Sequence, residues 1–161
     1  MIEKEKIEQG VVNMLKVNMG IKSGEKLLVI TDTPSAEEWI KKGSEELDKM
    51  IERSLLAKMV SEISKENFSD CEVEFYSYPS VGKHGTDPGK EVEEKMKEAG
   101  VVVAITSYSL SQTEARENAS KSGTRIASMP TFVPEDVLFR RSNGNRLYKN
   151  ARGRQKDSKA D

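Results

Sequence analysis

The stretch 101–105 constrains the fold of this chain more than any other. Its five residues form an unbroken apolar run in which four side chains are β-branched. Such a run, without polar alternation, is typical of a strand that is covered on both faces in a parallel sheet. A hydroxyl-rich segment, 106–113, follows it directly and leads into a helical pattern. We therefore expect this strand at the centre of an α/β fold, with the polar segment at the carboxyl edge of the sheet, where such folds bind ligands.

Three other segments have the pattern of strands, and helical patterns separate them. Residues 26–30 are mostly apolar, residues 72–78 alternate enough to indicate a strand near an edge, and residues 124–129 form the fourth strand. Strands that alternate with helices predict a parallel sheet with right-handed crossovers, most simply in the order second, first, third, fourth. The predicted fold is a three-layer, Rossmann-like α/β fold whose four-stranded, mostly parallel sheet has helices on both faces.

Apolar residues recur at helical spacing between these strands. The spacing predicts a leading helix that ends near Gly20, a short helical piece over 37–42 and a long charged helix over 44–65. Ser35 and Glu38 are spaced as a capping box for the short piece, and Trp39 is expected to pack against the sheet rather than bind a ligand. The stripe expected to bury the long helix consists of Leu47, Met50, Ile51, Leu55, Met59 and Ile63.

The helix after the central strand is predicted over 113–122, with Ser111 and Glu114 as a second capping box. Its apolar stripe consists only of Ala115 and Ala119, so the helix must lie close to the sheet. The short helix before the central strand is marked by Val92, Met96 and Ala99.

Composition divides the chain into a body and a tail. With 161 residues, of which 35% are hydrophobic and 33% charged, the chain is long enough for one charge-coated domain, expected over 1–139. The last 22 residues hold eight of the 26 Lys and Arg and two of the 27 Asp and Glu, which leaves 18 basic and 25 acidic residues in the body. The body therefore carries −7 and the tail +6. We expect segment 140–161 to be disordered. A basic tail either binds phosphates or is a solvated end, and we favour the second interpretation because, apart from Tyr148, no aromatic residue interleaves the charges.

Targeting signals are not evident in the sequence. The start of the chain lacks the apolar core of a signal peptide, and no apolar run approaches the length of a membrane span. We expect a cytoplasmic protein that does not bind membranes.

Residues for metal binding or catalysis are scarce. His84 and Cys71 are the only histidine and cysteine, so the chain has no set for a thiolate cluster, and a Ser-His-Asp arrangement would place His84 on a loop. That loop, 82–90, lies where a phosphate-binding loop would be, but His84 and Glu91 occupy its defining positions and Pro88 removes an N–H. We predict no catalytic residue and no metal ligand in this chain, and expect the acidic residues on helices to be solvated.

The carboxyl end of the central strand holds the residues most suited to bind a ligand. Hydroxyl groups, a helix start and an arginine together make a plausible site for an anion or a carboxylate. The alternative is that the same hydroxyl groups cap the helix and bond to the loop's own backbone. The candidate binding residues are Asp32, Thr106, Ser109, Gln112, Thr113 and Arg116.

Two motifs resemble a known family. Residues 109–116 (SLSQTEAR) and 123–130 (GTRIASMP) are similar to the amino-terminal domain of the aminopeptidase T and S family, metalloaminopeptidases of the thermophilic type. The similarity covers roughly residues 1–139 and extends to the leading helix, to Asp32 at the end of the first strand and to the central apolar strand. Two positions depart from the family, because Gln112 stands where histidine is common and Thr131 where glycine usually follows Met-Pro.

The resemblance implies a two-domain cytoplasmic enzyme, often dimeric, that removes amino-terminal residues from peptides. It also implies two divalent metal ions, zinc, cobalt or manganese, held by Glu, His, Asp and Tyr side chains of a carboxy-terminal domain that this sequence does not contain. No metal ligand can therefore be transferred to any residue here.

Three hypotheses follow from the sequence. The first is a non-catalytic amino-terminal α/β domain, a fragment or shortened relative of such an aminopeptidase, that serves as a scaffold or dimer surface for a catalytic domain or a second copy. The second is a small-molecule or anion binding module at the carboxyl end of the central strand. The third, nucleic-acid association through the basic tail, is the least favoured.

Overall fold

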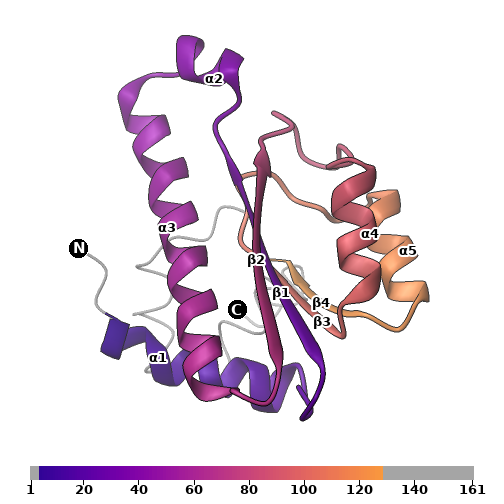
Figure 1. Cartoon of the computed structure of the whole chain (residues 1–161). Helices are drawn as coiled ribbons and strands as arrows, with labels where there is room; N and C mark the ends of the chain where they lie inside the picture. Colours follow the sequence, from indigo (N-terminus) through magenta and orange to yellow (C-terminus); the bar gives the residue numbers. More distant parts are fainter. Residues whose placement is uncertain (1–3, 129–161) are drawn as a thin grey trace, which may run out of the picture.

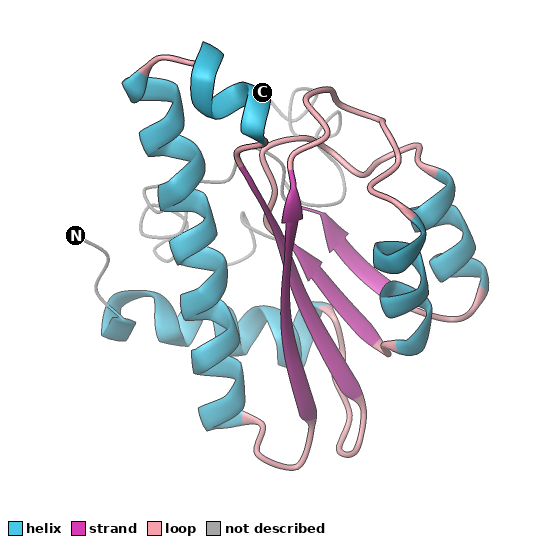
Figure 2. Cartoon of the chain, turned by 45° about the horizontal axis from the view of Figure 1, so that its top comes forward, coloured by secondary structure: helices cyan, strands magenta, loops and turns pink. Residues whose placement is uncertain are grey.

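A four-stranded parallel sheet organises the molecule. The computed structural model describes residues 4–128, and within them the strand order is β2-β1-β3-β4, with every pairing parallel (Figures 1 and 2). This confirms the predicted fold class and the predicted strand order. The strands are β1 (Lys26–Thr33), β2 (Glu72–Pro79), β3 (Val101–Ala104) and β4 (Arg125–Ser128).

Helices cover both faces of the sheet, which gives the three layers (Figure 1). One face packs on the leading helix, α1 (Lys4–Asn13) with its π-helical continuation η1 (Met14–Asn18), and on the long helix α3 (Ser44–Asn67). The opposite face packs on α4 (Lys90–Glu98) and α5 (Glu114–Lys121). Because successive side chains of a strand point to opposite faces, β3 supplies Val101 and Val103 to the first core and Val102 and Ala104 to the second.

The long helix is confirmed, and Met50 and Ile63 of its predicted stripe are buried, but the rest of the stripe matches only in part. Leu55 is 58% exposed and Ile51 is 36% exposed, whereas Leu56, Ala57 and Val60 are buried. Apolar residues occur on adjacent sides of this helix, so its sequence does not decide which side faces the sheet. The buried side also accepts polar side chains: Arg53 reaches the segment after β3, which makes its burial tolerable. Trp39, expected to pack, is 53% exposed.

Several element boundaries differ from the sequence pattern. Strand β1 continues three residues beyond 30, which places Asp32 inside the sheet at its carboxyl end. Helix α5 is capped by Thr113 instead of Ser111, because the hydroxyl of Thr113 accepts the N–H of Arg116. The capping box of Ser35 and Glu38 is confirmed in both directions. The predicted tail, 140–161, lies outside the described residues.

Helices long and apolar enough to cross a membrane are absent from the part of the chain that the structure describes.

Candidate functional site

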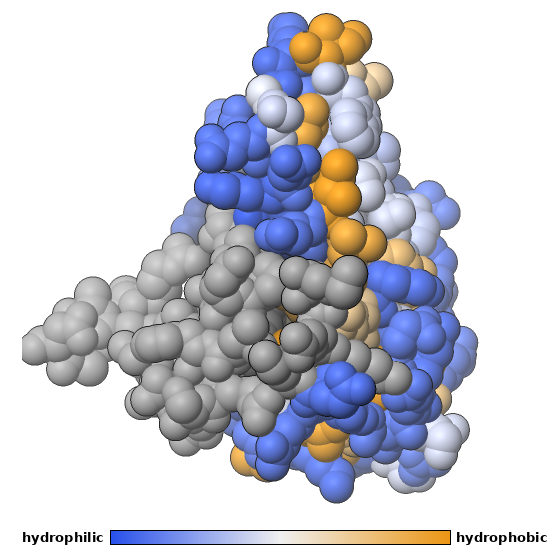
Figure 3. Space-filling model, turned by 90° about the vertical axis from the view of Figure 1, so that its left-hand side faces the viewer, coloured by the Kyte–Doolittle hydropathy of each residue, from blue (hydrophilic) through white to orange (hydrophobic). Residues whose placement is uncertain are grey.

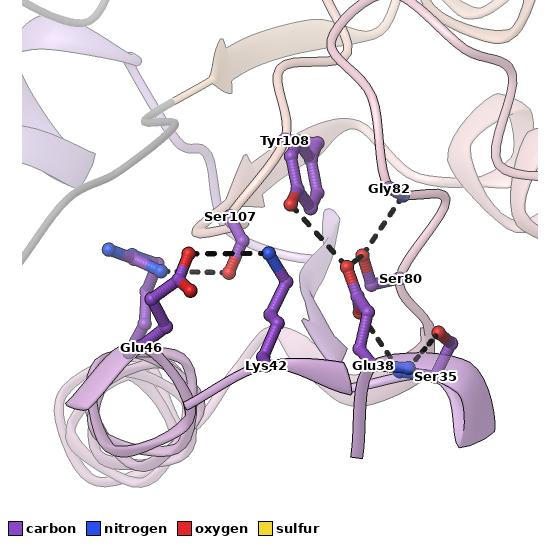
Figure 4. Close-up of polar contacts among 9 residues, drawn as sticks. Ser35, Glu38, Lys42, Glu46, Ser80, Gly82, Ser107 and Tyr108 are labelled. Atoms are coloured by element: carbon purple, nitrogen blue, oxygen red, sulfur yellow. Dashed lines mark hydrogen bonds and ion pairs between the residues drawn. The ribbon is translucent and has the colours of Figure 1, made fainter. Parts of the chain in front are cut away.

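A cavity of about 630 Å³ lies at the carboxyl edge of the sheet. Its walls come from segments that follow three neighbouring strands: α2 (Ala36–Lys41) after β1, the turn at Ser80 after β2, and Tyr108 after β3 (Figure 4). Ligand sites of parallel α/β sheets occur at this edge, where the chain leaves adjacent strands. The cavity is lined by Ser35, Ala36, Glu37, Glu38, Lys41, Lys42, Ser80, Val81, Gly82 and Tyr108.

The parallel sheet brings these segments together. The N–H of Ser80 donates to the carbonyl of Thr33 at 2.8 Å, so the ends of β1 and β2 leave the sheet at the same level. On the other side of β1, the N–H of Ile105 donates to the carbonyl of Ile30 at 3.0 Å and prolongs the pairing with β3. Three chain segments that are distant in sequence therefore start from one edge.

Glu38 is the central group of the cavity. It is only 8% exposed, and its Oε1 accepts the backbone N–H of Ser35 at 3.0 Å. Its Oε2 accepts the hydroxyl of Ser80 at 3.2 Å and the hydroxyl of Tyr108 at 3.4 Å. The Ser80 hydroxyl in turn accepts the N–H of Gly82 at 3.1 Å (Figure 4). A buried carboxylate is thus held in one orientation by three donors from three segments.

Lys42 brings a positive charge to the wall of the same cavity as Glu38. It follows α2 directly, and its Nζ lies 3.4 Å from the Glu46 carboxylate, while its side chain is 22% exposed. The Tyr108 hydroxyl beside it raises the pKa of the Lys42 ammonium group, and the charge of Glu46 adds to this effect. Lys42 is therefore charged at neutral pH.

Tyr108 is positioned by the loop that follows β2. Its ring meets the His84 ring edge-on, with 5.3 Å between the ring centres. The Nδ1 of His84 accepts the N–H of Ser109 at 2.9 Å, and the N–H of Gly85 donates to the Ser109 carbonyl at 3.0 Å. The Tyr108 hydroxyl donates its proton to the Glu38 carboxylate, so its oxygen can accept a further hydrogen bond.

Asp32 lies at the switch point between β1 and β3, where the sequence placed it, but it serves the protein's own backbone. It is 1% exposed, and its carboxylate accepts the N–H of Ser107 at 2.8 Å and that of Tyr108 at 3.4 Å. Burial raises the pKa of Asp32, although these N–H groups and the nearby Arg53 act in the opposite direction. Burial, with a smaller contribution from the Asp32 charge, also raises the pKa of the neighbouring Tyr78, whose buried hydroxyl has no hydrogen-bond partner.

The other predicted binding residues mostly satisfy their own loop. The hydroxyl of Thr106 donates to the Tyr108 carbonyl at 2.8 Å, and that of Thr113 donates to the Leu110 carbonyl at 2.6 Å. The hydroxyl of Ser109 accepts the N–H of Ser111 at 3.0 Å. For these three residues, the contacts correspond to the helix-capping and loop-bonding alternative rather than to an open anion site.

Gln112 and Arg116 do not join a shared site. Gln112 is exposed and has a positive φ of 68°, a left-handed backbone conformation that few residues other than glycine adopt. Arg116 is half-buried in the first turn of α5, and burial lowers its pKa; its Nη1 is buried without a hydrogen-bond partner. Neither residue lines the cavity.

Sequence reasoning pointed to the same edge of the sheet but did not name the residues of the cavity: Glu38, Lys42, Ser80 and Tyr108. The capping box was the available signal for Glu38, because it showed that this carboxylate turns back toward the start of α2. Nothing local indicated Ser80 or Lys42, since their roles depend on contacts with residues distant in sequence.

Within 4–128, His, Cys, Asp and Glu side chains form no group of three or more that could hold a metal ion. The fold and the cavity together define a Rossmann-like α/β domain with a polar, charged site at the carboxyl edge of its sheet. Comparisons with protein-family models, curated proteins and solved structures find no match to this chain.

Proposed function

We propose that this chain is a non-catalytic, cytoplasmic α/β domain that binds a small polar molecule in the cavity between α2, Ser80 and Tyr108. The observation that supports the proposal is the buried Glu38 carboxylate at the wall of an open cavity that Lys42 also lines. Burying a carboxylate costs free energy even when it is hydrogen-bonded, and besides its capping role Glu38 offers this charge to a ligand in the cavity.

The proposal is tested by mapping polar fragments with ¹H–¹⁵N correlation spectra of the labelled chain. Fragments that bind should shift the amide signals of Ser35, Glu38, Gly82 and Tyr108 in a saturable way. The Tyr108→Ala variant should change these titrations, whereas Lys65→Ala, at the far end of α3, should leave them unchanged. A polar fragment set that shifts none of the four signals at millimolar concentration contradicts the proposal.

A second candidate role rests on the apolar surface of α2 and α3. Trp39 is 53% exposed, Ile40 84% and Leu55 58%. Figure 3 shows apolar atoms that extend from the end of the molecule formed by α2 along the side of α3. Such a surface is typical of an interaction site. This surface supports the proposal that the chain is the amino-terminal domain of an aminopeptidase-like protein. In that protein the surface packs either on a catalytic domain that holds the two metal ions or on a second copy of the chain.

Two measurements test this second role. Peptidase assays of the purified chain with added zinc, cobalt or manganese should show no turnover, and metal-dependent turnover contradicts a non-catalytic domain. Light scattering should show a dimer that is weakened by the double change Ile40→Ser and Leu55→Ser. A monomer at all concentrations contradicts the dimer surface and leaves only a catalytic domain as the occupant.

A further inference from the structure

The Tyr108 hydroxyl lies close to both Glu38 and Lys42 at the cavity wall. Glu38 lies in α2 and Lys42 directly follows that helix, so the two residues are one turn apart, and both side chains point toward Tyr108 (Figure 4). The Tyr108 hydroxyl donates to Glu38 Oε2 at 3.4 Å, and the Lys42 ammonium group lies beside the same hydroxyl. One neutral oxygen atom therefore lies near the Glu38 carboxylate and near the Lys42 ammonium group, which is also paired with Glu46 at 3.4 Å.

The hydroxyl of Tyr108 is the weakest partner of Glu38. Its 3.4 Å contact is longer than the 3.0 Å bond from Ser35 and the 3.2 Å bond from Ser80. The side chain of Tyr108 is half-buried at the cavity wall, where a ligand could displace its hydroxyl from Glu38. Ser35 and Ser80 would still hold Glu38 in place.

A ligand that replaces this hydroxyl must match its polarity. It must donate a hydrogen bond toward Glu38 and accept one from Lys42. Hydrogen bonds between charged groups are about twice as strong as neutral ones, so a molecule with a cationic donor and an anionic acceptor replaces the hydroxyl most favourably. The second pair at the cavity wall, Lys41 and Glu37 at 2.8 Å, also carries both charges and leaves the wall electrically balanced.

We propose that the cavity binds a compact zwitterion, with its ammonium group on Glu38, its carboxylate on Lys42 and the Tyr108 hydroxyl displaced. This inference rests on the proposed binding function and specifies the ligand class. A dianion would bring negative charge against Glu38, and a dication would bring positive charge against Lys42. A neutral polyol would fit the hydrogen bonds but would lack the charge assistance.

The test compares three probes that differ in one charge each: glycine, glycinamide without the carboxylate, and N-acetylglycine without the ammonium group. Titrations are followed by the amide signals of Glu38, Lys42 and Tyr108 at constant ionic strength and neutral pH. Glycine should bind about tenfold more tightly than either blocked compound, the loss expected for one charged hydrogen bond. Equal affinities for all three compounds overturn the inference.

Two variants distinguish direct contact from a structural effect. Lys42→Met should abolish the preference for glycine over glycinamide, whereas Lys65→Met should preserve it. Tyr108→Phe should bind glycine several-fold more tightly, because no internal hydroxyl then has to be displaced from Glu38. A Lys42→Met protein that keeps the preference, or a Tyr108→Phe protein that binds glycine more weakly, overturns the inference.

The two proposals fail in different ways. If polar fragments shift the cavity signals but glycine shows no advantage over its blocked forms, the zwitterion inference is wrong and the binding function stands. If no fragment and none of the three probes shifts these signals, both proposals are wrong.

Discussion

Charged side chains at the two ends of the sheet differ in burial and in their hydrogen-bond partners. At the amino end, the guanidinium group of Arg125 pairs with the Glu25 carboxylate and also donates to the Gly20 carbonyl at 3.2 Å. These side chains are partly exposed, with 36% for Arg125 and 26% for Glu25. At the carboxyl end, Asp32 and Glu38 are buried and accept their hydrogen bonds from neutral N–H and O–H groups. A closed ion pair offers little to a ligand, whereas a buried carboxylate with neutral donors retains charge that a ligand can use.

Asp32→Ala should have the largest effect on stability. The change removes the acceptor for the N–H groups of Ser107 and Tyr108, and the first of these lies in a buried position. Leaving such a donor unpaired should lower the free energy of unfolding by about 3 kcal/mol, measured by urea denaturation. If stability changes by much less, Asp32 does not organise the segment after β3.

Gly100→Ala, at the amino end of the sheet, should have the second-largest effect on stability. A Cβ at this position would lie 2.8 Å from Glu25 Oε2 and 3.1 Å from Glu25 Cδ, and that carboxylate is held by Arg125. The overpacking should cost about 2 kcal/mol. In a Glu25→Ala background the same change should cost much less, since its neighbour is gone. An equal cost in both backgrounds would show that the clash is not with Glu25.

Glu38→Ala should have a smaller effect on stability than on binding. It removes one half of the capping box and the acceptor of the Ser80 hydroxyl, for a loss of about 1 kcal/mol in thermal or urea unfolding. Glu38→Gln keeps the shape and should fold with a smaller loss. Unchanged ligand binding in Glu38→Gln would remove this carboxylate from the proposed site.

The smallest effects concern pH and should have opposite signs at the two ends. The hydrogen bond from Arg125 lowers the pKa of Glu25, so the stability from this pair is present above the ordinary pKa of a glutamate and is lost as pH falls through the lowered value. Burial raises the pKa of Asp32, so its contribution is most favourable when it is protonated and declines as pH rises through the raised value.

Glu25→Gln should therefore remove part of the acid-induced loss of stability, about 0.5 kcal/mol for a partly exposed pair. Asp32→Asn should remove part of the loss of stability that occurs as pH rises through the raised pKa of Asp32. Both effects are read from unfolding free energies measured from pH 3 to 8. If the two substitutions changed the pH dependence of the unfolding free energy in the same direction, the proposed difference between the two ends would be wrong.

Sequence patterns predicted the fold because apolar residues recur along the chain at the spacings of buried strands and helices. The apolar run at 101–105 indicated a strand covered on both faces, and the structure places it beside β1 with helices on either side. The edge position of β2 followed from its alternation. The stripe predicted for α3 was only partly correct, since Met50 and Ile63 are buried but Leu55 is exposed and its neighbour Leu56 is buried instead.

What the sequence by itself determined is the layered parallel fold and the edge of the sheet at which polar groups collect. Only the tertiary structure decided which polar groups those are. Thr106, Ser109 and Thr113 bond to their own loop, because a hydroxyl near free backbone groups finds a partner locally. Glu38, Lys42 and Tyr108 meet because parallel pairing brings the ends of β1 and β3 to one edge, and no local pattern encodes a contact between residues 70 positions apart.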